Sequence, residues 1–121
     1  MNDSKRGTVW VLQESIIPGS NGVPMDYSAA ERYGDVQFVL TVEPSKHDGS
    51  TINEHVAEEL ARMAMLYREN EDYIVLTGSP VAIFMAGAAI AAAGKAARML
   101  VWNRKTAVYR PISLPLALAA A

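Results

Sequence analysis

Cysteine is absent from the sequence, which excludes disulfide bonds and thiolate metal sites. Histidine is scarce, because His47 and His55 are the only two among 121 residues. Helical spacing would bring His55 close to Glu58 or Glu59, but no third ligand converges on them, and this pattern is more typical of a solvated helix face. We therefore predict neither a metal site nor a cofactor.

Long hydrophobic runs are also missing. The longest apolar run covers residues 81–93, well short of the roughly 20 residues that a membrane span needs. The first twelve residues lack the apolar core of a signal peptide. The sequence thus predicts a cytoplasmic protein without a membrane partner.

Acidic residues are absent from the C-terminal part of the chain. All 13 Asp and Glu residues lie at or before Asp72, together with six of the 11 Lys and Arg residues. The part up to Asp72 therefore carries a net charge of 6 − 13 = −7, and the part after it carries +5. The basic part would favour an anionic ligand, or it would pair with the acidic part of the same or a neighbouring molecule. The sequence leaves both alternatives open.

Composition and periodicity predict one α/β domain over residues 1–121. Half of the residues are hydrophobic and a fifth are charged, as in globular proteins, and no linker or repeat divides the chain. Short apolar segments bounded by turn residues predict strands at residues 8–13, 35–42, 73–76, 98–102 and 106–112. Polar loops are expected at residues 14–26 and 43–50, and a helical turn that Asp26 caps at residues 27–33.

Two main helices are expected between these strands. Thr51 and Glu54 form a capping box at the start of an amphipathic helix over residues 51–67, and an Ala-rich helix follows at residues 80–93. This order predicts a single Rossmann-like sandwich, with a mostly parallel sheet of about five strands and a C-terminal antiparallel hairpin. Pro111 and Pro115 would keep the last strand short or place it at an edge of the sheet.

The residues Thr77-Gly-Ser-Pro80 join a buried strand to the Ala-rich helix. Ser79 is a favoured N-cap, Pro80 suits the first helical position, and Gly94 suits the position after the helix. Gly78 would let the backbone approach a phosphate, to which the hydroxyls of Thr77 and Ser79 could donate. The pattern is neither a Walker loop nor G-x-G-x-x-G, and a plain capped turn is the somewhat better explanation of it.

A second candidate site lies at the end of the next strand. Trp102 could stack on a base, and Arg104 could form a forked contact with a phosphate, with Asn103 and Lys105 beside them. The alternative is a solvated hairpin tip with a half-buried Trp102. No catalytic set stands out, although Lys95 and Glu14 are conceivable participants in phosphodiester cleavage.

The helix at residues 81–93 has no polar side, so it requires burial all round. A homo-oligomer would supply this burial, and burial within one chain is the alternative. The residues predicted to form the interface are Val81, Phe84, Met85, Ala86 and Ala89. The apolar segment at residues 114–121 is expected to lie across a neighbour as an arm.

The stretch Tyr73-Ile-Val-Leu-Thr-Gly-Ser-Pro80, the apolar helix, Leu100-Val-Trp-Asn-Arg104 and Tyr109-Arg-Pro-Ile112 resemble small phage and bacterial α/β proteins. More distantly, they are similar to CRISPR-associated Rossmann-fold sensors of cyclic oligonucleotides and to small ring nucleases. The resemblance covers about forty residues. It implies a cyclic oligonucleotide bound across a dimer, with Thr77, Gly78, Ser79 and Arg104 in contact with it. The catalytic His of some of these nucleases has no counterpart after Pro80.

These patterns lead to three functional hypotheses. The first is a homo-oligomeric nucleotide- or phosphate-binding module, a phage- or defence-related sensor or sponge. The second is a small phosphodiesterase similar to ring nucleases. The third is a structural or assembly protein that packs through its apolar helix and C-terminal arm. None of the three involves duplex nucleic acid.

Overall fold

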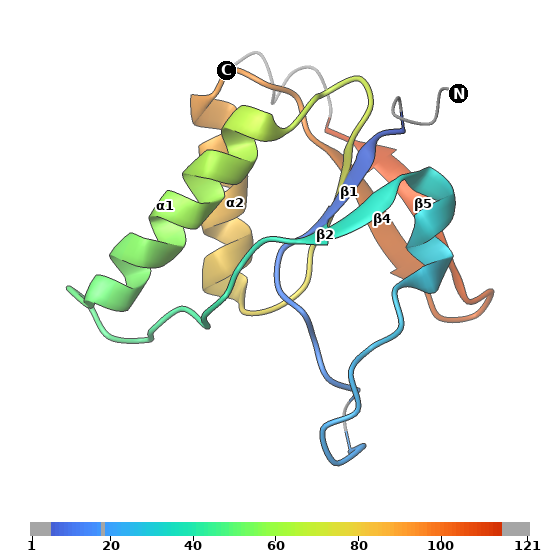
Figure 1. Cartoon of the computed structure of the whole chain (residues 1–121), viewed down its shortest axis with the longest axis horizontal. Coiled ribbons are helices and arrows are strands. Elements are labelled where there is room, and N and C mark those ends of the chain that lie inside the picture. The colour runs from blue at the N-terminus through green and yellow to red at the C-terminus, as the bar shows by residue number, and fades with distance from the viewer. Residues whose placement is uncertain (1–5, 18, 115–121) are drawn as a thin grey trace.

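The computed structural model describes residues 6–17 and 19–114 (Figure 1). Its strands form one five-stranded sheet in the order β2-β1-β3-β4-β5. The strands are β1 (Thr8–Val11), β2 (Asp35–Phe38), β3 (Tyr73–Val75), β4 (Arg98–Asn103) and β5 (Val108–Ser113). All neighbours pair in parallel except β4 and β5, which are antiparallel. The predicted α/β class, mostly parallel sheet and C-terminal hairpin are confirmed.

Helices cover the two faces of the sheet unequally. The long helices α1 (Thr51–Leu66) and α2 (Pro80–Ala92) pack together on one face, and the short 3-10 helix η2 (Ser28–Tyr33) lies on the other (Figure 1). Side chains of β1 alternate between the layers: Val9 and Val11 join the core under η2, whereas Trp10 and Leu12 face α1 and α2. The apolar first strand is therefore buried on both faces, as expected for a central parallel strand.

The strand β2 is shorter than predicted. The N–H groups of Val39 and Leu40 both bond to the neighbouring chain of β1, to the carbonyls of Val11 and Leu12, each at 2.9 Å. Consecutive residues of a regular strand point their N–H groups to opposite sides, so this repetition ends the strand at Phe38.

The helix ends agree with the sequence at α2 and differ by one residue at α1. Ser79 caps α2 with Pro80 in its first turn, and Gly94, with a φ of +74°, ends it as predicted. For α1 the predicted cap Thr51 is wrong, because the Ser50 hydroxyl accepts the Ile52 N–H at 3.1 Å and Thr51 is already helical. Serine and threonine both cap well, so the sequence did not distinguish the two.

The C-terminal end of α1 is closed by a lysine from a later segment. Lys95 Nζ donates to the carbonyl oxygens of Ala64, Met65 and Tyr67 at 2.8, 2.9 and 2.7 Å. A cation at this position satisfies carbonyls that have no helical partner and opposes the negative end of the helix dipole. Lys95 therefore has a structural role, which replaces the hypothesis that it takes part in phosphodiester cleavage. None of the helices in the described ranges is long and apolar enough to cross a membrane.

Candidate functional site

The strand order reverses direction between β1 and β3, since β2 lies on one side of this pair and β4 on the other. In parallel sheets, ligands bind beyond the carboxyl ends of the strands at such a point. Here those ends carry Gln13, two residues after β1, and Thr77, two residues after β3. The predicted turn at residues 77–80 thus lies where a ligand site would form.

The hydroxyl of Thr77 is used within the protein. Thr77 Oγ1 donates to the Gln13 carbonyl at 2.5 Å and accepts the Gln13 N–H at 3.2 Å. Both bonds tie the end of β1 to the end of β3. The single hydroxyl proton is thereby occupied, so the expectation that Thr77 donates to a phosphate does not hold.

Gly78 is needed for the approach of Gln13. Its φ is +96°, and a Cβ added there would lie 2.2 Å from Gln13 Oε1 and 2.8 Å from Gln13 Cβ. Gln13 Oε1 is itself buried and, within the described part of the chain, has no hydrogen-bond partner. The amide of Gln13 thus fills the space predicted for an anion, and a carbonyl oxygen there would repel one. Sequence reasoning missed Gln13, although it is the first polar residue after a buried strand.

Ser79 and Pro80 serve the start of α2. The Ser79 hydroxyl accepts the Ala82 N–H at 3.2 Å, and Pro80 has no N–H to offer. The cap therefore occupies the Ala82 N–H, which could otherwise donate a hydrogen bond to a bound phosphate. Of the two alternatives for this turn, the structure favours the plain capped turn.

The second candidate group, Trp102, Asn103 and Arg104, lies at the β4–β5 hairpin. Asn103 Oδ1 accepts the N–H groups of Lys105 and Thr106 at 2.9 and 3.2 Å, so this side chain shapes the turn. Trp102 is 39% exposed, and its ring meets the ring of Tyr109 edge-on, with centroids 5.0 Å apart. Trp102 is therefore held by a neighbour and yet open to solvent.

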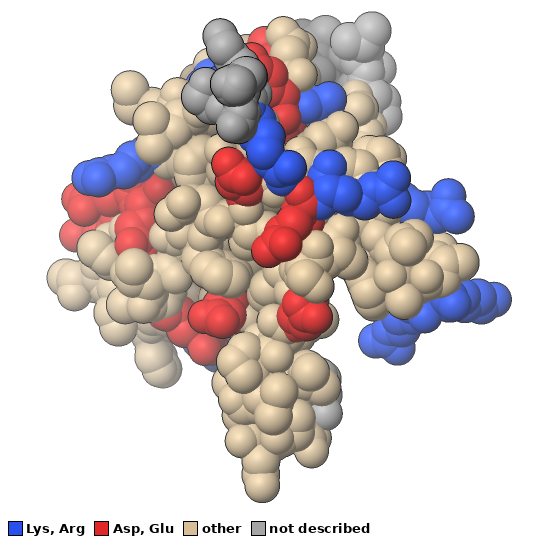
Figure 2. All heavy atoms as spheres, turned by 45° about the vertical axis from the view of Figure 1, so that its right-hand side comes forward, with Lys and Arg blue, Asp and Glu red and all other residues tan. Residues whose placement is uncertain are grey.

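A shallow hollow of about 400 Å³ borders this hairpin. It is lined by Val101, Trp102, Asn103, Arg104, Lys105, Arg110 and Ile112. Figure 2 shows Lys and Arg side chains projecting on the right of the molecule, where the hairpin comes forward, and Asp and Glu side chains nearer the left and centre. The hairpin thus gathers three basic residues, Arg104, Lys105 and Arg110, and none of them forms an ion pair with a described residue.

The other two basic residues of the C-terminal part are engaged inside the protein. Lys95 closes α1, and the Arg98 guanidinium lies 4.2 Å from the centre of the Tyr73 ring and donates to the Asp72 carbonyl at 3.3 Å. The charge asymmetry of the sequence thus reduces to the three cations of the hairpin. Neither contact is an ion pair with an acidic side chain, so the described residues show no pairing of the basic part with the acidic part, and the hairpin offers its three charges to an anion.

A fully buried carboxylate, Asp72, lies at the opposite, amino-terminal end of β3. It accepts the backbone N–H groups of Thr8 and Arg68 at 2.8 and 2.9 Å, the Trp10 indole N–H at 3.0 Å and the Arg68 guanidinium at 3.2 Å. Burial alone would raise the pKa of Asp72, but these hydrogen bonds outweigh it, and the pKa lies below its ordinary value. All its oxygens are engaged, so Asp72 is a structural residue.

Metal ligands do not gather anywhere in the residues that the structure describes: no three His, Asp or Glu side chains approach one another closely enough. His55 lies 3.7 Å from Glu59 on α1, at helical spacing. Glu59 instead holds the loop after β2, where it accepts the N–H and the hydroxyl of Thr41 at 3.1 and 2.8 Å.

The fold and the site together define a small α/β protein in which the turn at residues 77–80 is filled by internal hydrogen bonds and the β4–β5 hairpin is basic. The chain belongs to the phage Pam3 gp32-like protein family, whose model matches residues 7–116. It is therefore a phage-related protein, in line with the resemblance to phage α/β proteins. No curated protein matches the chain, and neither does any solved structure. Nothing in these comparisons points to CRISPR-associated sensors or to ring nucleases.

Proposed function

We propose that the protein is a homo-oligomeric assembly protein whose copies associate through the side of the sheet that carries α1 and α2. The main observation in its favour is that β4 and β5, which form half of this side of the sheet, have no helix packed over them in the described residues. Residues 104–107 lead β4 directly back into β5, so the described chain places no helix between these two strands. A sheet face that is left bare in this way exposes apolar side chains that a partner can bury.

The bare half of the sheet is apolar. Leu100 and Tyr109 are buried in the core under η2, so alternation directs Val101 and Ile112 toward the side of the long helices. Val101 is 42% exposed and Ile112 is 47% exposed. Together with Arg110 they line the hollow of the hairpin.

The outward side of α2 adds to this surface. Phe84 is 80% exposed and Val81 42%, and the other exposed residues of this helix are proline, glycine and alanine. The described residues therefore do not provide the burial that was expected on all sides of this helix, which supports association. The predicted interface needs one correction: Ala86 is buried in the core, and Met85 and Ala89 pack against that core near α1, so Phe84 and Val81 remain its accessible members.

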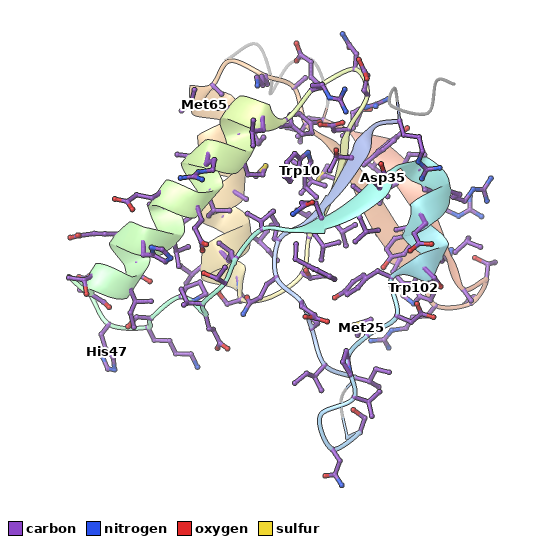
Figure 3. All side chains as sticks on the ribbon, in the orientation of Figure 1. Trp10, Met25, Asp35, His47, Met65 and Trp102 are labelled. Atoms are coloured by element: carbon purple, nitrogen blue, oxygen red, sulfur yellow. The ribbon has the colours of Figure 1, made fainter. Side chains whose placement is uncertain are left out.

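Size-exclusion chromatography with light scattering tests the assembly. We expect the wild type to elute above the 13.1 kDa of one chain, and Phe84→Glu to lower the mean mass, because a charge at this exposed position cannot be buried in an apolar contact. Met65→Glu is the matched control, since Met65 is 78% exposed but lies near the end of α1 (Figure 3). Equal masses for the wild type and Phe84→Glu, or a monomeric wild type, would contradict the proposal.

A second candidate function is the binding of a phosphate-bearing ligand at the hairpin. Arg104, Lys105 and Arg110 favour it, since they form no ion pair with any residue that the structure describes, and the exposed Trp102 offers a ring on which a base can stack. A Rossmann-like sheet, which remains part of this proposal, would bind its ligand where the strand order reverses, but Gln13 fills that position, so the hairpin is the better candidate. A cyclic oligonucleotide is the ligand that the resemblance to CRISPR-associated sensors implies. The phosphodiesterase hypothesis is weaker, because Lys95, one of its two candidate residues, is bound to the end of α1 and the described residues suggest no replacement for it.

Thermal-shift measurements with mono-, di- and cyclic nucleotides test this second function. A ligand present at a hundred times its dissociation constant stabilises the folded state by about 2.7 kcal/mol. We expect one class to raise the melting temperature of the wild type, and the double change Arg104→Ala/Lys105→Ala to remove most of that rise. Arg62→Ala on α1 controls for the loss of charge alone. A rise that survives the double change would place the ligand elsewhere.

A further inference from the structure

The free edge of β2 and the adjacent side of α1 form a groove. From their geometry we infer that this groove binds residues 116–119 of a neighbouring copy as an additional strand. The contact uses neither α2 nor the hairpin, so it goes beyond the proposed function and either can fail alone.

The outer edge of β2 carries backbone groups that pair with no other strand among the described residues. The N–H groups of Asp35 and Val39 point toward β1, where they bond to the carbonyls of Gly7 and Val11 at 2.9 Å. Alternation along the strand then directs the N–H and C=O groups of Val36 and Phe38 away from β1. These groups can pair with an extended peptide, which is how exposed sheet edges bind segments of other chains.

The other edge of the sheet is a poorer template. On β5, Pro111 has no N–H, and its neighbour Arg110 carries a charge. Proline and charged residues on an edge strand discourage the addition of a further strand. Of the two edges, β2 is therefore the receptive one.

A hollow of about 510 Å³ between β2 and α1 can take the side chains of the added strand. Trp10 and Val39 line it from the sheet, Met63 and Leu66 line it from the helix, and Glu58 and Arg62 also border it. Figure 3 shows Trp10 in the space between α1 and the sheet. The Trp10 indole is fixed by its hydrogen bond to Asp72, so this wall exists before any segment binds.

The chain itself contains a segment of the matching pattern. Residues 114–119 read Leu-Pro-Leu-Ala-Leu-Ala, with large apolar side chains at every second position and small ones between them. This period of two is typical of a strand with one buried face. Leu116 and Leu118 would enter the hollow, and Ala117 and Ala119 would face the other way. Residues 115–121 lie outside the described residues, and the predicted arm falls on them.

Distance requires that the groove belong to a different copy. Leu114 follows β5, where its N–H bonds to the Ala97 carbonyl, and β5 and β2 are the opposite edges of the sheet. Four strand spacings separate them, about 19 Å. Two residues, from Leu114 to Leu116, span at most about 7 Å. Each copy therefore donates a strand from one edge and accepts one at the other, which is a head-to-tail contact that closes into a ring or grows as a filament.

Full-length variants in a Phe84→Glu background, which removes the proposed contact through α2, test this inference by light scattering and native mass spectrometry. The double change Leu116→Ser/Leu118→Ser is expected to weaken association at least tenfold. The matched change Ala117→Ser/Ala119→Ser is expected to alter it less than twofold. On the receiving side, Phe38→Pro should abolish association by removing an outward N–H, whereas Phe38→Ala, which keeps that N–H, should retain it.

Mixing gives the decisive result. The Leu116→Ser/Leu118→Ser variant keeps an intact edge, and the Phe38→Pro variant keeps an intact segment, so each alone should be monomeric and a mixture should form a one-to-one heterodimer. Failure to form this heterodimer, or equal effects of the leucine and alanine changes, would overturn the inference. The Phe84→Glu and Met65→Glu comparison with an unchanged segment reports separately on the contact through α2.

Discussion

Replacement of Asp72 by alanine is expected to lower the free energy of unfolding by about 3–5 kcal/mol. The carboxylate is fully buried and accepts hydrogen bonds from Thr8, Trp10 and Arg68. Its removal leaves the Thr8 and Arg68 N–H groups and the Trp10 indole N–H without their acceptor, and a donor left unsatisfied in the interior costs more than the bond itself contributes. Urea denaturation followed by circular dichroism measures the change.

Glu71→Ala is the control for this experiment, because Glu71 also pairs with Arg68, at 3.0 Å, but is exposed. Its removal should cost less than about 1 kcal/mol. The pH dependence of stability should also distinguish the two carboxylates. The pKa of Asp72 is lowered in the folded state, so its contribution to stability is present above the unfolded pKa of about 3.9 and is lost as the pH falls through the folded pKa. Equal losses for Asp72→Ala and Glu71→Ala would contradict the role assigned to this carboxylate.

A second large effect is expected at the turn between β3 and α2. Gly78→Ala should lower the free energy of unfolding by about 2–4 kcal/mol, from left-handed backbone strain and from the clash with Gln13. The φ of +96° and the 2.2 Å approach to Gln13 Oε1 are the two causes. Thermal and urea unfolding of purified variants measure the loss.

The two causes can be separated with a second substitution. Gln13→Ala removes the two side-chain atoms beyond Cβ that the added methyl group would meet, Oε1 at 2.2 Å and Cδ at 3.0 Å, but keeps the Cβ at 2.8 Å and the backbone strain. Gly78→Ala should therefore cost less in a Gln13→Ala background than in the wild type. Gly87→Ala on the exposed side of α2 is the control, because nothing lies within 4 Å of the added methyl group. There the helix should gain about 0.5–1 kcal/mol. An undiminished cost in the Gln13→Ala background would show that the packing of Gln13 on Gly78 is unimportant.

The parts of the fold that depend on residues adjacent in the sequence could be predicted from the sequence. Ser79, Pro80 and Gly94 mark the ends of α2 by their own backbone preferences, and all three lie where the pattern placed them. The position of Pro111 on an edge strand followed from its missing N–H in the same way. Where two neighbours had equal preference, as Ser50 and Thr51 do, the local pattern could not decide.

The candidate site depended instead on contacts between distant residues. Thr77 looked free to donate, but its partner Gln13 lies 64 residues earlier in the chain. Lys95 looked like a candidate for chemistry, and its partners are carbonyls 28 to 31 residues before it. Backbone carbonyls and amides are present at every residue, so no residue type marks them as partners. The hairpin residues Trp102, Asn103 and Arg104 were found because their turn is local.

The contact of Lys95 with α1 also bears on the order in which the chain can fold during synthesis. The carbonyls that Lys95 binds at the end of α1 belong to Ala64, Met65 and the following residue Tyr67, which are synthesised 28 to 31 residues before Lys95. Until the turn after α2 emerges, the end of α1 has only water to bond with. The end of the first long helix is thus completed only after the second helix has been synthesised, by the segment that leads into β4.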